Sequence, residues 1–219
     1  MFRYFDDYYI HVDTEEYAQK ALKFAHQILA ELQLSINENK LKIQRFPFGF
    51  QETWVKEIND VHFEKASSSN IKQYFSTLFS LANDFPENSS TIFSYGLRTF
   101  ERRSTIIDVR NWKVFESLLL KSILIESSVL DIVSRIIETY KTQVSSIKVK
   151  SVLIKILEYH CELNHHYETV WSLWIFKQLK LKLPDDLIDK IINSSDNFSL
   201  LLLLDLDNEN LIEGGKLSL

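Results

Sequence analysis

Residues 2–12 read FRYFDDYYIHV, and this stretch decides how the first part of the chain is interpreted. Aromatic and β-branched side chains, which favour β-strands, flank Asp6 and Asp7 on both sides. Two acidic residues between two such runs are typical of a tight turn. The stretch therefore predicts a β-hairpin that carries both carboxylates at its turn.

A helix and a second pair of strands are predicted next. Apolar residues recur at helical spacing at Tyr17, Ala21, Phe24, Ile28 and Leu32. We therefore expect an amphipathic helix over residues 14–33, with Asp13 as its N-cap. Apolar and polar residues alternate in 34–36 and in 41–43, which predicts two short strands joined by a turn. We expect residues 34–46 to pair beside the first hairpin and the helix to cover one side of the sheet.

The remainder of the chain is predicted to be helical. The serines at 67–69 suggest a boundary between a first domain, residues 1–66, and a helical domain, residues 67–219. Helices with short connections are predicted at residues 70–84, 90–103, 111–126, 127–142, 146–162, 167–181, 185–193 and 196–206. The predicted fold class is α+β and mostly α, with a hairpin-helix-hairpin unit before an all-helical, repeat-like region. No repeated residue signature identifies a repeat type.

The composition agrees with a mostly helical chain. Of its 219 residues 45% are hydrophobic, and only four Gly and three Pro are present, which argues against a turn-rich β-sandwich. Cys161 is the only cysteine, which excludes an intrachain disulfide and favours a reducing compartment. No secretory signal is recognisable, and the apolar run 200–204 is far shorter than the roughly 20 residues that cross a bilayer. We expect a cytoplasmic protein with no membrane partner.

The net charge of −5 is unevenly distributed along the chain. Residues 67–182 carry 15 basic and 11 acidic side chains, whereas residues 183–219 carry 2 basic and 8 acidic ones. A mildly basic middle suits a nucleic-acid backbone, and a solvated helical surface explains the same excess equally well.

Asp6 and Asp7 are the best candidates for metal ligands. Hard divalent cations prefer carboxylate oxygens, and a turn presents two adjacent side chains outward. Phosphoryl transfer by two metal ions needs further carboxylates, which must come from elsewhere in the chain or from a partner. Two aspartates in a turn are also common without any metal. We therefore expect weak Mg²⁺ binding.

Residues 3–10, RYFDDYYI, resemble motif C of reverse transcriptases, in which Tyr-x-Asp-Asp joins two antiparallel strands. Residues 32–43, LQLSINENKLKI, are similar to motif D of group II intron and bacterial reverse transcriptases, where Leu-Gly-Leu leads through a polar turn to Lys-Thr. Gln33 stands at the usual glycine and Leu41 at the usual threonine, whereas Lys40 matches.

The resemblance implies an RNA-directed DNA polymerase, a nucleotidyltransferase that uses Mg²⁺. Asp6 and Asp7 would be the catalytic metal ligands, and Lys40 would approach the phosphates of the incoming nucleotide. An exposed turn lysine is the alternative for Lys40. Tyr4 and Phe5 would contact the nucleic acid.

Residues 165–174, HHYETVWSLW, look like a stretch that follows the palm in bacterial reverse transcriptases of the abortive-infection and anti-phage defence kind. Aromatic residues at spacings of three and four are more often part of a helical core than of a functional site. His165 and His166 with Glu168 suggest a metal site, but no further ligand is nearby in the sequence.

The densest basic segment, residues 96–103, lies where a thumb-like helical element follows the palm. Arg98 and Arg102 fall on one helix face, and Arg103 is adjacent. These arginines would bind a template-primer backbone, although Glu101 and Asp108 nearby also fit an ordinary ion-paired surface.

Motifs A and B of the family do not occur in this sequence. The resemblance therefore implies the C-terminal part of a polymerase, inactive alone, whose fingers and remaining palm come from another segment or a partner chain. Exposed strand edges of a partial palm would favour self-association. The alternative is a non-catalytic helical scaffold that binds nucleic acid or a protein.

Overall fold

The computed structural model describes residues 2–4, 7–38, 41–43, 53–61, 67–102, 107–194 and 196–215; for residues 2–4, 7 and 99–102 it describes the backbone only. The chain divides into two compact units, Met1–Phe50 and Gln51–Leu219. The structure is mostly helical, as the sequence predicts. Within the described ranges, no helix is both long and apolar enough to cross a membrane.

The first unit contains one strand pair and one helix. Strands β1 (Phe2–Tyr4) and β2 (Asp7–Tyr9) pair in antiparallel fashion, as predicted for the start of the chain. Helix α1 (Glu15–Glu31) follows. Its N-cap is Thr14, whose hydroxyl accepts from the Tyr17 N–H at 3.3 Å, so the prediction of Asp13 as the cap is wrong by one residue.

The second strand pair is not observed. Residues 34–38 and 41–43, the part of this stretch that the structure describes, contain no strand. The Leu34 N–H donates to the Leu29 carbonyl and thereby closes the C-terminus of α1, so this residue is not available for a strand ladder. The Leu41 N–H donates to Glu38 in a local turn.

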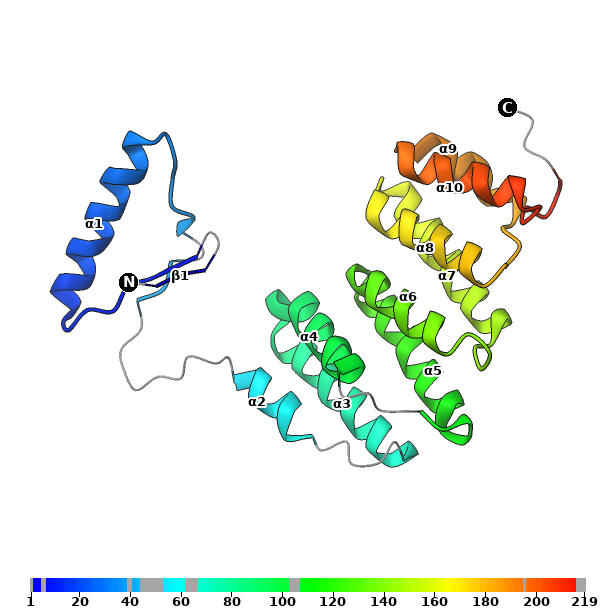
Figure 1. Cartoon of the computed structure of the whole chain (residues 1–219), viewed down its shortest axis with the longest axis horizontal. Coiled ribbons are helices and arrows are strands. Elements are labelled where there is room, and N and C mark those ends of the chain that lie inside the picture. The colour runs from blue at the N-terminus through cyan, green and yellow to red at the C-terminus, as the bar shows by residue number, and fades with distance from the viewer. Residues whose placement is uncertain are drawn as a thin grey trace. The chain divides into compact units, whose positions relative to one another are not determined.

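The second unit is a stack of helices that extends from α2 to α10 (Figure 1). Short 3-10 turns, η2 (Pro86–Asn88), η3 (Ser127–Val129) and η4 (Asp185–Leu187), precede three of the helices. The helices are α2 (Thr53–Asp60), α3 (Ser68–Asp84), α4 (Ser89–Arg102), α5 (Val109–Ile125), α6 (Leu130–Thr139), α7 (Ser146–Glu162), α8 (His166–Gln178), α9 (Ile188–Ser194) and α10 (Asn197–Asn208).

Consecutive helices form pairs, and each pair packs on the next. Helix α3 lies against both α4 and α5, α4 against α6, α5 against α7, α6 against α8, α7 against α9, and α8 against α10. Two layers of alternating helices result, with one continuous apolar core between them. The predicted stacked array of helical pairs is therefore present.

The helical unit begins before the predicted boundary at Ser67. Helix α2, which the sequence analysis missed, buries Trp54 and Ile58 and packs against α3 and α4. The Trp54 ring meets Tyr95 of α4 edge to face, with centroids 5.6 Å apart. Side-chain caps fix the starts of later helices: Ser67 accepts from the Asn70 N–H, and Asp108 and Asp196 act in the same way for α5 and α10.

Candidate functional site

The strand pair at the start of the chain sets the geometry of the predicted metal-binding turn. Tyr4 lies opposite Asp7 in the ladder, and Phe2 lies opposite Tyr9. Asp7 is thus the first residue of β2, and two residues separate the strands along the chain. For Tyr4 and Asp7 the structure describes the backbone only. Four predicted site residues lie outside the described part of the chain: Phe5, Asp6, Lys40 and Arg103.

The end of α1 has the backbone of a glycine-containing turn although no glycine is present. Gln33 has a φ of 57°, the left-handed conformation that glycine adopts at little energetic cost. Its N–H donates to Ala30, and the next N–H, of Leu34, donates to Leu29. These two bonds are those of a Schellman motif. Gln33 therefore has a backbone conformation that glycine would adopt more readily.

Helix α1 exposes the apolar stripe that the sequence predicts it to bury. None of its residues is buried. Large side chains on this stripe are open to solvent, with exposed fractions of 57% for Tyr17, 63% for Phe24 and 64% for Leu32. Exposed apolar patches of this kind mark surfaces that another element or chain covers.

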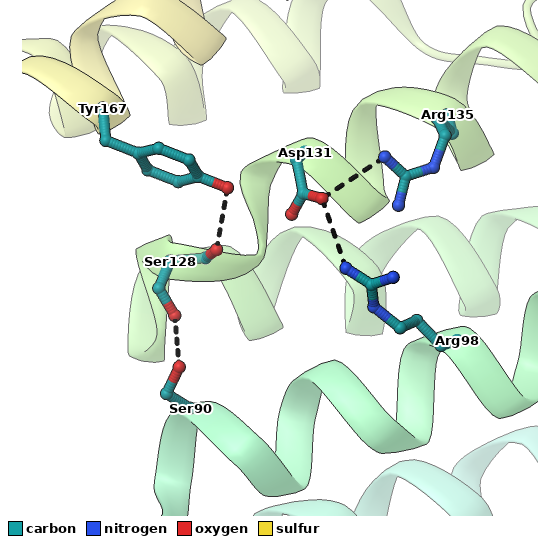
Figure 2. A network of polar contacts seen from close by, with 6 residues as sticks. All are labelled: Ser90, Arg98, Ser128, Asp131, Arg135 and Tyr167. Carbon is teal, nitrogen blue, oxygen red and sulfur yellow. Dashed lines mark hydrogen bonds and ion pairs between the residues drawn. The ribbon is translucent and has the colours of Figure 1, made fainter. Parts of the chain in front are cut away.

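Arg98, one of the predicted nucleic-acid ligands, takes part in a polar network between α4 and α6 (Figure 2). Its guanidinium lies 3.7 Å from the Asp131 carboxylate, which also binds Arg135 of the same helix at 3.3 Å. Half of the Arg98 side chain remains exposed. The ion partner comes from α6, and Asp108, one of the two acids near Arg98 in the sequence, pairs with Arg110 at 2.8 Å. The backbone of Arg102 lies in α4.

The network continues to α8 through Tyr167. The Tyr167 hydroxyl donates to the Ser128 carbonyl at 3.2 Å, and the Ser128 hydroxyl lies 2.8 Å from that of Ser90 (Figure 2). Burial of the hydroxyl end, together with the nearby Asp131 carboxylate, raises the pKa of Tyr167 to about 12. Three consecutive helical pairs are joined at this point.

Of the aromatic residues in 165–174, Trp171 packs against the core, whereas Tyr167 and Trp174 lie at the surface, so the interpretation of this stripe as core holds only for Trp171. Tyr167 is 44% and Trp174 38% exposed, and Trp171 is half-buried beside Tyr167. The core-facing side of α8 is formed by Thr169, Ser172, Leu173, Ile175 and Phe176.

A histidine and carboxylate cluster lies where α7 turns into α8. The Nδ1 atoms of His160 and His165 are 2.9 Å apart, and one ligand atom from each of His160, His165 and Glu168 lies within 4.8 Å of the others. His160 is buried, Glu168 is half-buried and His165 is exposed. The structure therefore supplies a ligand that the sequence analysis did not name. It is His160, and His166 is not part of the cluster.

The surroundings of His160 favour its neutral form. Burial lowers the pKa of His160, and the neighbouring His165 acts in the same direction, whereas Glu168 partly opposes them. His160 also lines an open pocket of about 370 Å³ between α5 and α7, together with Ile123, Leu124, Ile125, Ser127, Lys155, Ile156 and Tyr159. Cys161 is buried, with its sulfur 3.9 Å from the Thr169 hydroxyl.

Comparisons of the chain with protein-family models, with curated proteins and with solved structures find no match.

Proposed function

We propose that this chain is the C-terminal part of an RNA-directed DNA polymerase, in which residues 1–50 contribute motif C of the palm. The observation that supports this best is the antiparallel strand pair with Tyr4 opposite Asp7. This register leaves Phe5 and Asp6, the central residues of the Tyr-x-Asp-Asp sequence, between the two strands, as in the hairpin of motif C. The glycine-like backbone of Gln33 adds support from motif D.

The exposed stripe of α1 supports completion of the palm by a further segment. Phe24, Ile28 and Leu32 are spaced to form one apolar strip along the helix. In a complete palm such a helix packs on a sheet larger than the two short strands of this unit. The remaining strands, with motifs A and B, belong to another stretch of polypeptide or to a partner chain.

The donor set at the turn fits Mg²⁺, because Asp6 and Asp7 offer only carboxylate oxygens. Bound Mg²⁺ supplies charge neutralisation at the phosphates of a nucleotide. The role of this chain is to hold the two carboxylates on a strand pair. Lys40 neutralises negative charge on the leaving pyrophosphate, and Arg98, Arg102 and Arg103 bind the template-primer backbone.

Metal binding by the chain alone tests the first step of this proposal. Mn²⁺, a paramagnetic substitute for Mg²⁺, should broaden the amide signals of Asp7, Tyr8 and Tyr9 at millimolar concentrations, since two carboxylates are a weak site. The Asp6→Asn variant should lose this broadening. Asp13→Asn, six residues beyond Asp7 in an exposed segment, is the matched control and should keep it. Broadening that survives Asp6→Asn would exclude the proposed metal site.

A non-catalytic helical scaffold is the second candidate function. The ion pair between Arg98 and Asp131 favours this function. A guanidinium whose charge is already partly neutralised by a carboxylate binds a phosphate less strongly. The helical unit also has an extensive core of its own and offers an elongated surface of stacked pairs. This candidate predicts binding without nucleotide incorporation in any reconstituted assembly.

A further inference from the structure

We propose that His160, His165 and Glu168 form a Zn²⁺ site that joins the end of α7 to the start of α8. The inference is independent of the proposed polymerase function, because none of these residues belongs to the palm-like unit. Its basis is the convergence of two imidazole nitrogens and one carboxylate within 4.8 Å.

The local fold explains why the ligands converge. His160 lies in the last turn of α7, and Asn164 then adopts a φ of 55°, a left-handed conformation that reverses the chain. The His165 N–H donates back to the His160 carbonyl at 3.0 Å, which holds the two histidines on the same corner. Glu168 follows in the first turn of α8 and faces the same point.

The distances are close to those of a coordinated ion. Zn²⁺ binds imidazole nitrogen at about 2.0–2.1 Å, so two nitrogens in a tetrahedral shell lie about 3.3 Å apart. The observed separation of the two Nδ1 atoms is 2.9 Å, and a small rotation of the exposed His165 ring accommodates the difference. Glu168 is half-buried and needs only a side-chain adjustment to approach the same ion.

The chemistry of the ligands selects the type of ion. Two imidazoles and one carboxylate suit Zn²⁺, whereas Mg²⁺ prefers a shell of oxygen ligands. Three protein ligands leave a fourth position for water, and the exposure of His165 gives the ion a path from solvent.

Zn²⁺ titration of the tag-free chain, after chelator treatment and removal of the chelator, tests the site. Calorimetry should give about one Zn²⁺ per chain, because the cluster forms one shell. His165→Ala should weaken binding by at least about 100-fold and Glu168→Gln by at least about 10-fold, since loss even of outer-shell partners reduces affinity 10–100-fold. His165 is exposed, so its replacement should leave the helical circular dichroism unchanged.

His166→Ala is the matched control, because it removes an adjacent exposed histidine that lies outside the cluster. It should bind Zn²⁺ as the wild type does. Co²⁺ in place of Zn²⁺ should give the visible absorption of a four-coordinate ion, and His165→Ala should abolish it. The absence of saturable binding, or equal losses in His165→Ala and His166→Ala, would overturn the proposal.

A variant of the predicted palm turn separates the two proposals. Asp6→Asn should leave Zn²⁺ affinity unchanged, whereas it removes the Mn²⁺ effect at β2. Loss of Zn²⁺ binding in Asp6→Asn would assign the ion to the turn and contradict the site at the α7–α8 corner. Zn²⁺ binding that persists while Asp6→Asn leaves the Mn²⁺ broadening unchanged would support the corner site and reject only the metal site at the turn.

Discussion

Arg98 of α4 and Asp131 of α6 form an ion pair across two successive helical pairs, with the nitrogen and oxygen 3.7 Å apart. Asp131 is only 19% exposed, whereas Arg98 is half exposed. Exposed ion pairs contribute about 0.2–1 kcal/mol, so Arg98→Ala and Asp131→Asn should each lower the free energy of unfolding by about 1 kcal/mol or less. A double-mutant cycle by urea denaturation should give a coupling of about 0.5 kcal/mol. Additive losses would show that the two side chains act independently.

Glu116 should stabilise the helical unit more than its partner Lys148 does. The Glu116 side chain is 3% exposed; it accepts from the Ser145 N–H at 2.6 Å and pairs with Lys148 at 3.2 Å. Glu116→Ala leaves the partly buried Ser145 N–H without its acceptor and should cost about 1–3 kcal/mol. Lys148 is 47% exposed, and Lys148→Ala should cost less than about 1 kcal/mol. Equal losses in urea denaturation would refute this asymmetry.

The end of α1 provides two substitutions of the same residue type with opposite expected effects. Gln33 has a φ of 57°, so Gln33→Gly should relieve strain and stabilise the helix by about 1 kcal/mol. Gln27 lies exposed within α1, and Gln27→Gly should destabilise it by about 1 kcal/mol. Amide hydrogen exchange of α1 should slow in the first variant and accelerate in the second. Faster exchange in Gln33→Gly would exclude the left-handed conformation.

Tyr167 should make stability sensitive to alkaline pH. Its pKa is about 12 in the folded chain against 10.0 as the ordinary value, so folding favours the protonated phenol. The contribution is fully present below pH 10 and is lost as the pH rises from 10 towards 12. The urea midpoint of the wild type should therefore fall more steeply above pH 10 than that of Tyr167→Phe. Parallel curves for the two proteins would contradict the raised pKa.

Helix positions could be predicted from the sequence where apolar periodicity and polar connections coincide. Residues 146–162 were expected to be helical, and α7 has these bounds. Helix α2 was missed because its eight residues are too few for a clear period. The prediction of a strand at 34–36 was wrong. An apolar residue just after a helix can also close the C-terminus of that helix, and Leu34 does so by donating its N–H to the Leu29 carbonyl.

Of the candidate sites, the sequence could indicate those whose residues are adjacent along the chain. Asp6 and Asp7 are recognisable in this way, whereas the spacing of His160 and His165 indicates no contact unless Asn164 reverses the chain between them. Asn164 is the available signal, since Asn often takes the left-handed position after a helix. The pairing of Arg98 with Asp131 depends on how two helical pairs stack, and local sequence carries no information on that.

DNA synthesis by the completed palm is the most direct test of the proposed function. The chain should be combined with a fingers-and-palm segment that carries motifs A and B and supplied with a primed RNA or DNA template, nucleotides and Mg²⁺. We predict incorporation that requires both parts, is lost in Asp6→Ala and is retained in the control Asp13→Ala. Incorporation that Asp6→Ala leaves intact, or its absence on every template tested, would contradict the assignment of residues 1–50 to a polymerase palm.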